Sequence, residues 1–312
     1  MKYGFGVDLG GTTVKIAYFD ETGNMLQKWE IPTDRAENGK NILPDIAEAI
    51  KSYITKNYVN QNEVVGIGIG VPGAVLPDGT VNKCINLGWG VFNIEKELSA
   101  LTGFAVKAGN DATVAAMGEC WKGGGQGCEN MVFATLGTGV GGGIVVGGKV
   151  IHGVHGAGGE IGHLVLNRNE TEQCNCGKYG CVEQYCSATG IVRLAKKHLA
   201  ATAEACSLRN LADITCKDVF DAGAAGDKVA LEILEQVYSC LGEFLADICC
   251  VTDPEVIVLG GGVSRAGQPL LEGAKKYYQK YVFHAAKDTR ITLATLGNDA
   301  GAYGAFKLVL DK

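Results

Sequence analysis

The N-terminal segment Phe5-Gly-Val-Asp-Leu-Gly-Gly-Thr-Thr-Val-Lys-Ile-Ala-Tyr-Phe19 carries the clearest information about the fold. Its β-branched and aromatic residues flank a glycine pair, and this pattern predicts a strand, a glycine turn and a second strand. The stretch Met131-Val-Phe-Ala-Thr-Leu-Gly-Thr-Gly-Val-Gly-Gly-Gly-Ile-Val-Val146 has the same order of residue types. Two similar hairpins therefore predict a chain that is built from two similar halves.

The correspondence continues downstream of each hairpin. Residues 64–70 and 256–262 are short apolar runs, and each ends in glycine. A short apolar run that leads into a turn residue predicts a buried strand. Apolar residues recur at helical spacing before each of these runs, at Ile42, Ile46, Ile50 and Ile54 and again at Val229, Ile233, Val237, Leu241 and Leu245. Hairpins combined with strand–helix alternation predict mixed-sheet α/β domains, and we expect a central cleft between the two halves.

Composition excludes several classes of partner. The 312-residue chain has a formal net charge of −6 and no lysine-rich stripe, which argues against nucleic acid as a partner. No apolar run approaches the length of a bilayer span, so no membrane partner is expected. The first residues, Met1-Lys2-Tyr3-Gly4, do not form an apolar signal segment, and we expect a cytoplasmic protein in a reducing compartment.

One histidine and three cysteines have the spacing of a metal site. His163 is followed by Cys174, Cys176 and Cys181, a Cys₃His set that suits tetrahedral Zn²⁺ in a closed structural site. Glycines between the cysteines supply the tight turns that such a knuckle requires. The alternatives are buried thiols or a disulfide framework, but a chain of this length can bury a large core without disulfides.

The glycine loops are candidate phosphate sites. The run from Gly137 to Gly142 formally matches G-x-G-x-x-G, but the residues after it continue as a strand instead of a helix, so a Rossmann site is not expected. No P-loop motif is present. Two glycine hairpins could instead offer backbone N–H groups and threonine hydroxyls to one polyphosphate. Asp8 would add a carboxylate for Mg²⁺, and Lys15 a cation for a phosphate.

Five segments, in this order, resemble the ROK family of sugar kinases and repressors: Asp8 to Thr12, Asn110-Asp111, Leu136 to Gly143, Gly159 to His163, and the cysteine knuckle. The resemblance covers essentially the whole chain. It implies the duplicated ribonuclease H-like fold of actin and hexokinase-type ATPases. It also implies a small N-terminal domain at residues 1–115, completed by a helix at 298–312, and a larger domain at 116–297 that carries the zinc and the dimer contact.

The resemblance also implies roles for individual residues. Asp111 aligns with the catalytic base, although the local sequence alone favours a helix cap at this position. The implied ligands of the sugar hydroxyls are Asn110, Asp111, Glu160, His163 and Glu183, and the loop at Gly73 would select by shape at the sugar C2. The implied nucleotide-binding residues are Asp8, Gly10, Gly11, Thr12, Thr13, Lys15, Thr138, Gly139, Gly260, Gly261 and Gly262. Many family members have Lys or Asn at the position of Thr13.

The expected activity is ATP- and Mg²⁺-dependent phosphorylation of glucose at its 6-hydroxyl, beside a structural zinc. A kinase for another hexose or for N-acetylmannosamine is the nearest alternative. A sugar-responsive repressor would need a DNA-binding helix-turn-helix ahead of the kinase-like body, whereas the first predicted strand begins at Phe5. The family resemblance implies a homodimer and leaves a tetramer open.

Overall fold

The computed structural model describes residues 1–311 and divides them into two compact units. Unit 1 comprises Met1–Gly127, Gly143–Gly159 and the chain from Thr295 onward, and unit 2 comprises Cys128–Gly142 and Glu160–Ala294. Unit 1 extends beyond the expected boundary at residue 115 because helix α3 (Asp111–Lys122) packs on the C-terminal helix α9 (Ala300–Leu310). The segment that begins at Gly143 joins unit 1 because it also packs on α3, at Ala116.

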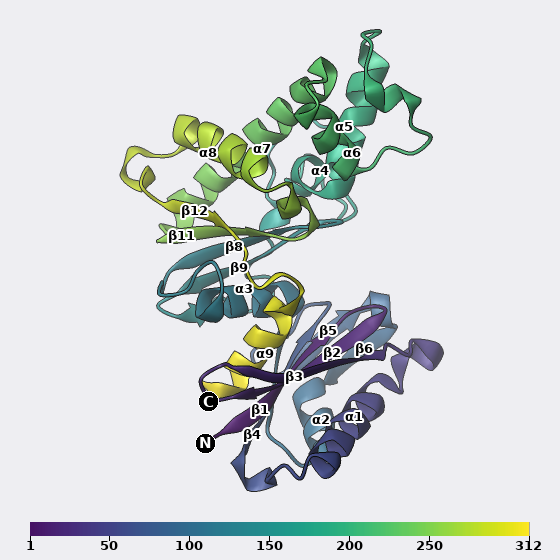
Figure 1. Ribbon diagram of the computed structural model, residues 1–312, viewed down its shortest axis with the longest axis vertical. Coiled ribbons are helices and arrows are strands. Elements are labelled where there is room, and N and C mark those ends of the chain that lie inside the picture. Colours follow the sequence, from purple (N-terminus) through teal and green to yellow (C-terminus); the bar gives the residue numbers. More distant parts are fainter. Residues whose placement is uncertain (312) are drawn as a thin grey trace. The chain divides into compact units, whose positions relative to one another are not determined.

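The sheet of unit 1 has five strands in the order β3-β2-β1-β4-β7. Figure 1 labels β1 to β4. The hairpin predicted at the N-terminus is confirmed, since β1 and β2 pair in antiparallel fashion and β3 continues the meander. The strands β4 and β7 run parallel to β1 on its other side. The bounds are β1 (Tyr3–Leu9), β2 (Thr13–Asp20), β3 (Met25–Pro32), β4 (Val64–Val71) and β7 (Val106–Asn110).

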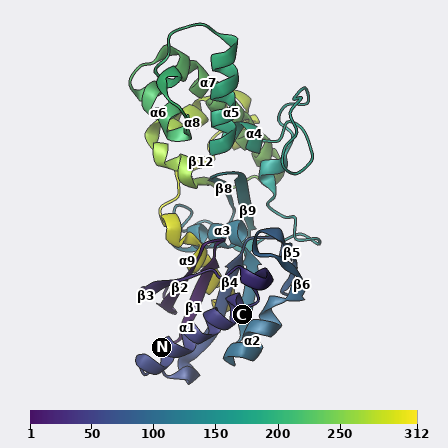
Figure 2. The ribbon, with the colours of Figure 1, turned by 90° about the vertical axis from the view of Figure 1, so that its right-hand side faces the viewer.

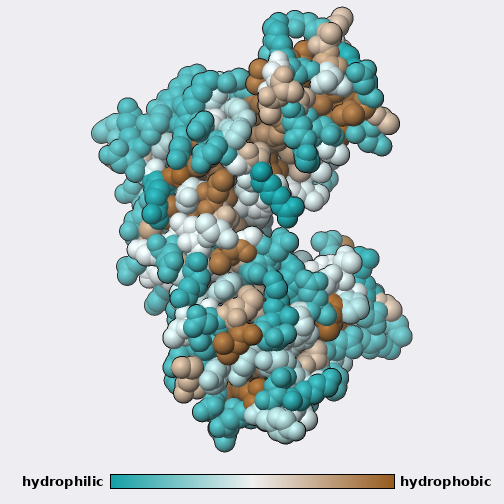
Figure 3. Space-filling model, in the orientation of Figure 1, coloured by the Kyte–Doolittle hydropathy of each residue, from teal (hydrophilic) through white to brown (hydrophobic). Residues whose placement is uncertain are grey.

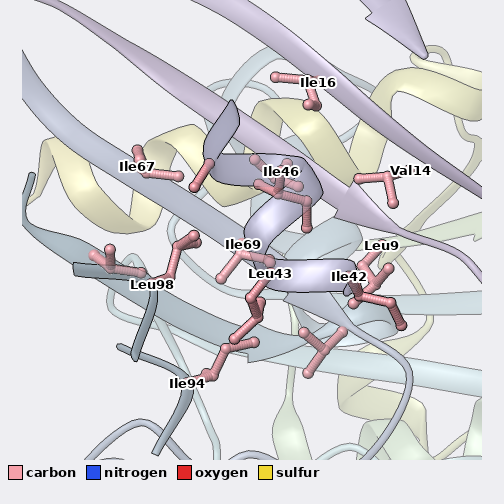
Figure 4. Close-up of a cluster of buried hydrophobic side chains, with 14 of the residues drawn as sticks. Leu9, Val14, Ile16, Ile42, Leu43, Ile46, Ile67, Ile69, Ile94 and Leu98 are labelled. Carbon is pink, nitrogen blue, oxygen red and sulfur yellow. The ribbon is translucent and has the colours of Figure 1, made fainter. Parts of the chain in front are cut away.

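One face of this sheet carries the large apolar side chains. Strand residues alternate between faces, so Val7 and Leu9 of β1 and Ile69 of β4 point the same way. They pack against the isoleucine stripe of α1 (Ile42–Lys56) and against α2 (Ile94–Thr102), as Figure 4 shows. This cluster contains fully buried residues from strands and helices alike, and it forms the main core of unit 1.

The opposite face of the same strands carries glycine and receives α9. A Cβ atom at Gly68 would lie 1.6 Å from the carbonyl oxygen of Ala305, and one at Gly6 would lie 2.0 Å from that of Ala302. Helix and sheet backbones are therefore in direct contact, which only glycine permits at these positions. Beyond them, Phe19 stacks on Phe306 with ring centroids 5.1 Å apart.

A small hairpin, β5 (Thr80–Cys84) and β6 (Trp89–Asn93), forms a separate two-stranded sheet in unit 1 (Figure 2). Short 3₁₀ turns lie at Ala36–Gly39 (η1), Gln61–Glu63 (η2), Ile85–Leu87 (η3), Ile161–His163 (η4), Ser207–Asn210 (η5), Gly262–Ala266 (η6), His284–Ala286 (η7) and Gly297–Asp299 (η8).

The second sheet repeats the topology of the first, in the order β10-β9-β8-β11-β12. The strands β8, β11 and β12 are parallel, and β9 pairs with β10 in antiparallel fashion, as β2 does with β3. The bounds are β8 (Met131–Leu136), β9 (Val140–Val146), β10 (Lys149–Val150), β11 (Val256–Gly260) and β12 (Arg290–Leu293). The matching order confirms the duplication that the two hairpins predicted.

Five helices complete unit 2: α4 (Glu183–Cys186), α5 (Ala188–Ala201), α6 (Cys216–Ala224), α7 (Lys228–Thr252) and α8 (Gln268–Tyr281). The helix α7 buries its apolar stripe and ends at Asp253, whose φ of 41° marks a left-handed cap. Figure 3 shows hydrophilic residues over much of the visible surface, with hydrophobic residues in patches between them. No helix within residues 1–311 combines the length and the apolar character that a bilayer crossing requires.

Candidate functional site

The first group of candidate residues lies at one edge of the unit 1 sheet. The strands β1, β4 and β7 are parallel, so their carboxyl ends meet at the same edge. Asp8 pairs with Gly70 there, and Val71 pairs with Asn110. Ligands of open α/β sheets bind outside the carboxyl ends of the strands. The structure therefore brings Asp8, Asn110 and Asp111 to the edge where a ligand is expected.

Asn110 is the N-cap of α3. Its Oδ1 accepts hydrogen bonds from the backbone N–H groups of Ala112 at 3.0 Å and Thr113 at 3.2 Å. Its Nδ2 donates to the carbonyl oxygen of Gly73, 3.1 Å away, and so ties the end of β7 to the loop after β4. The alternative in which Asp111 caps this helix is wrong, because Asp111 is the first residue inside α3.

Asp111 lies where the helix dipole favours a negative charge. Its Oδ1 accepts from the backbone N–H of Ala112 at 2.8 Å, and it begins α3. The neighbouring Cys84 is buried, and burial, together with the charge of Asp111, raises the pKa of its thiol. Cys84 donates to the carbonyl oxygen of Pro72, so the loop beside Asp111 is held from this side as well.

The first glycine hairpin places Asp8 and Lys15 side by side. The Nζ of Lys15 lies 3.2 Å from Oδ2 of Asp8 and 3.2 Å from the carbonyl oxygen of Asn298. The turn itself is closed by the N–H of Gly10, which donates to the carbonyl oxygen of Thr13 at 3.0 Å. The carboxylate and the ammonium are thus paired with each other.

In the second sheet, as in the first, glycine segments follow the carboxyl ends of the strands. The strands β8 and β11 are parallel, and Gly260 pairs with Thr135. The loop from Gly137 to Gly139 and the turn from Gly260 to Gly262 therefore follow neighbouring carboxyl ends. Gly261 has a φ of 81°, in the left-handed region that favours glycine.

Sequence reasoning missed a pocket that borders this turn. A cavity of about 500 Å³ is lined on one side by Gly262 and Arg265 and on the other by Lys217 and Phe220 of α6. Its size and its largely apolar wall suit a small organic ligand. A sequence signal for α6 exists in the capping box of Thr215 and Asp218, which marks the start of the helix.

The predicted Cys₃His cluster is confirmed as a geometric group. The ligand atoms of His163, Cys174, Cys176 and Cys181 all lie within 4.8 Å of one another. The Sγ atoms of Cys176 and Cys181 are 3.6 Å apart, and Cys174 Sγ lies 3.9 Å from Nδ1 of His163. A tetrahedral zinc with Zn–S bonds of about 2.3 Å places its sulfur ligands roughly 3.8 Å apart. The donor set and its spacing fit a structural zinc.

The surroundings of the cluster are only partly open to solvent. Cys174 and Cys181 are buried, while Cys176 is exposed. Burial and the neighbouring thiols raise the pKa of Cys181 to about 12. The carbonyl oxygen of His163 accepts from Nζ of Lys178 at 2.6 Å, which fixes the backbone of η4. Glu160 precedes η4 and is exposed.

Glu183 lies between the cluster and the second glycine loop. Its Oε1 is 3.7 Å from Sγ of Cys174, and its Oε2 accepts from the backbone N–H of Val140 at 3.0 Å. Glu160, His163 and Glu183 are thus in unit 2, whereas Asn110 and Asp111 are in unit 1.

Residues 4–312 of the chain match the sequence profile of the ROK family. The chain belongs to the ROK family. Among its ROK relatives, the glucokinase of Halalkalibacterium halodurans is 41% identical over 97% of this chain and 94% of that protein. The glucokinase of Thermotoga maritima is 34% identical over 98% of this chain and 97% of that protein.

A solved ROK structure matches the fold over nearly the full chain. The ROK family glucokinase from Streptomyces griseus, in complex with glucose and AMPPNP, has a TM-score of 0.78 and 31% identity, and the match covers 99% of this chain and 100% of that one. This likeness confirms the duplicated actin-like ATPase fold that the family resemblance implied.

Proposed function

We propose that this protein is a glucokinase, which transfers the γ-phosphoryl group of ATP to the 6-hydroxyl of glucose. The observation that carries the proposal is the 41% identity with a glucokinase over 97% of this chain. The glucokinase structure that matches both sequence and fold was solved with glucose and an ATP analogue bound. The two sheet edges, each with a glycine segment, are consistent with the proposal.

In the proposed reaction, Asp111 accepts the proton of the sugar 6-hydroxyl. The hydroxyl oxygen forms a bond to the γ-phosphorus, the bond from that phosphorus to the β-phosphate oxygen breaks, and ADP leaves with the electron pair. A general base in such a step must lie within hydrogen-bond reach of the hydroxyl and must be ionised. The position of Asp111 at the N-terminus of α3 supports the second condition.

The remaining residues of the proposed site bind and orient the two substrates, glucose and ATP. Asn110, Glu160, His163 and Glu183 would hold sugar hydroxyls, because amides and carboxylates match pairs of neighbouring hydroxyls. Gly73 would border the sugar, on the loop that Asn110 holds. The proposed contacts to ATP are made by Gly10, Gly11, Thr12, Thr13 and Lys15, by Thr138 and Gly139, and by Gly260, Gly261 and Gly262.

The proposed function involves two metal ions, Mg²⁺ and Zn²⁺. Mg²⁺ would neutralise phosphate charge, and Asp8 is the carboxylate on the first glycine hairpin that suits it. The side chain of Asp8 is 20% exposed, so it is accessible to an ion even though it contacts Lys15. Zinc would be held by the Cys₃His cluster, where it fixes the protein backbone and takes no part in the reaction.

The test is a substrate panel. Purified protein with ATP and Mg²⁺ is assayed for ADP release on glucose, mannose, fructose, N-acetylglucosamine and N-acetylmannosamine. We expect the highest kcat/KM on glucose and a product that glucose-6-phosphate dehydrogenase oxidises. The matched control is 6-deoxyglucose, which lacks the accepting hydroxyl and should inhibit without being consumed. A higher kcat/KM on N-acetylmannosamine would replace the proposed substrate, and sugar binding without turnover of any sugar would favour a regulator.

We also propose that the protein acts in the cytoplasm as a homodimer, with a tetramer as the alternative assembly. Light scattering coupled to gel filtration distinguishes these states by mass, since one chain weighs 32.7 kDa. A monomer at working concentration would contradict the assembly that the family resemblance implies.

A further inference from the structure

The second glycine loop is held by side chains from the segment that follows the zinc knuckle. The loop is a tight turn, in which the N–H of Gly137 donates to the carbonyl oxygen of Gly139 at 2.9 Å. All of the contacts described below lie inside unit 2.

Three hydrogen bonds join the loop to the segment between Glu183 and Thr189. The backbone N–H of Ala188 donates to the carbonyl oxygen of Gly137 at 2.8 Å. The hydroxyl of Thr189 donates to the carbonyl oxygen of Thr138 at 2.7 Å. At the other end of the loop, Glu183 Oε2 accepts from the N–H of Val140 at 3.0 Å.

Two hydroxyl groups in this segment, those of Ser187 and Thr189, donate to backbone carbonyl oxygens. Ser187 is fully buried, donates to the carbonyl oxygen of Glu183 at 2.6 Å and accepts from the N–H of Gly190 at 2.9 Å. Each hydroxyl has one proton. The proton of Ser187 goes to the carbonyl oxygen of Glu183, and that of Thr189 goes to the carbonyl oxygen of Thr138. The two hydroxyl oxygens lie 3.1 Å apart, so the buried serine packs directly beside the exposed threonine.

Gly139 leaves room for the carboxylate of Glu183. A Cβ atom at Gly139 would lie 2.2 Å from Glu183 Oε2, so any other residue would displace that oxygen. Glu183 is also two residues after Cys181 in the sequence and lies 3.7 Å from Sγ of Cys174. The same carboxylate therefore touches both the metal cluster and the phosphate loop.

We propose that Thr189 is a positioning residue that, together with Glu183, holds the loop from Gly137 to Val140 in the shape that receives the phosphates of ATP. This role of Glu183 is additional to the sugar contact that the proposed function gives it. This inference rests on the proposed kinase function. It adds that the zinc knuckle supports nucleotide binding, through the short segment that links Cys181 to Thr189. Thr189 itself contacts neither reactant in this proposal and acts only through the carbonyl oxygen of Thr138.

The test compares Thr189→Val, which removes the hydroxyl, with Thr189→Ser, which keeps it. Loss of one such hydrogen bond corresponds to a change of about three- to ten-fold in affinity. We expect Thr189→Val to raise KM for ATP by that factor while KM for glucose stays within about two-fold of wild type. Thr189→Ser should restore the wild-type KM for ATP. Thr171→Val is the matched control, since Thr171 is an exposed threonine near the knuckle.

A second measurement observes the loop directly. Hydrogen exchange followed by mass spectrometry on a peptide that covers residues 136–141 should be faster in Thr189→Val and in the zinc-stripped wild type, and unchanged in Thr171→Val. Unchanged exchange and unchanged KM for ATP in Thr189→Val would overturn the inference while leaving an active glucokinase intact. A wild-type protein that does not turn over ATP would overturn the proposed function, and the nucleotide role of this loop with it.

Discussion

The side-chain amide of Asn110 donates a hydrogen bond to the carbonyl oxygen of Gly73, 3.1 Å away. The same side chain caps α3 through its Oδ1. One residue therefore links the start of the helix that carries Asp111 to the loop that follows β4. A change at Asn110 should affect helix stability and loop position together.

Asn110→Ala should raise KM for glucose, and the rise should be larger than the loss of a helix cap alone would cause. Loss of the cap costs about 1 kcal/mol, and the Gly73 loop loses its anchor as well. The matched control is Asn93→Ala. Asn93 caps α2 through the N–H of Lys96 and donates to the carbonyl oxygen of Asp78, but it is not at the site edge. Equal effects of both variants on KM for glucose, measured in the coupled assay, would show that neither the proposed sugar contact of Asn110 nor its bond to Gly73 contributes to sugar binding.

Asp111→Asn should bind glucose with near wild-type affinity and lose at least about 100-fold in kcat, because an amide cannot take the hydroxyl proton. Isothermal titration measures the binding, and a coupled assay measures turnover. Asp45→Asn, on the first turn of α1, is the control for a charge change in the same unit. Wild-type kcat in Asp111→Asn would remove this residue from the role of base.

The sequence predicted the parts of the fold in which each residue pattern has one structural solution. Apolar residues that alternate on both sides of Gly10-Gly11 are typical of a hairpin, which β1 and β2 form. The zinc cluster was predictable for the same reason, since three thiols and an imidazole at that spacing have few other uses.

Other features could not be read from the sequence because they depend on contacts between distant residues. The need for glycine at positions 6 and 68 is one such feature, because the residues that they contact lie on α9 at the other end of the chain. The pocket beside Phe220 needs α6 and the turn at Gly262 to be neighbours, which no local pattern encodes. Likewise, Glu183 was predicted to hold a sugar, and its bond to the Val140 amide became visible only in the folded chain.

Glu119→Ala should destabilise the protein by roughly 3–5 kcal/mol. The Glu119 side chain is fully buried, and its carboxylate accepts from the backbone N–H groups of Gly124 at 2.8 Å, Thr295 at 3.1 Å and Leu296 at 2.9 Å. Truncation removes the acceptor that these three N–H groups share and leaves a cavity at a fully buried position. Urea denaturation of the variant, beside Glu48→Ala on the exposed side of α1, measures the loss. A loss no larger than that of the control would contradict the importance of this carboxylate.

Cys176→Ser should lower the zinc content of purified protein from about one ion per chain to a small fraction of that value. Cys176 is the exposed member of the cluster, so the substitution leaves the buried core packing in place. Elemental analysis gives the content, and a melting curve gives the stability, which should fall because metal-binding energy is also folding energy. Cys250→Ser, at another exposed cysteine, should keep its zinc. Full zinc occupancy in Cys176→Ser would mean that the metal does not use this thiol.

Glu170 should make the stability of unit 2 depend on pH in the acid range. Burial raises its pKa, but hydrogen bonds from the hydroxyl of Tyr185, the backbone N–H of Glu172 and the guanidinium of Arg193 outweigh burial and lower the pKa to about 2. A lowered pKa stabilises the fold above the unfolded-state value of about 4.5, and this contribution is lost as pH falls toward 2.

Glu170→Gln should therefore be less stable than wild type by roughly 2 kcal/mol at pH 7, and the difference should shrink steadily between about pH 4.5 and 2. The matched control is Glu172→Gln. Glu172 also binds Arg193 and Lys197, but its side chain is 49% exposed whereas that of Glu170 is 7% exposed. Solvent screens the exposed pair, so this control should change stability far less. Denaturant melts across the pH range measure both variants, and a pH-independent gap between Glu170→Gln and wild type would mean that packing, and not the charge of Glu170, accounts for the loss.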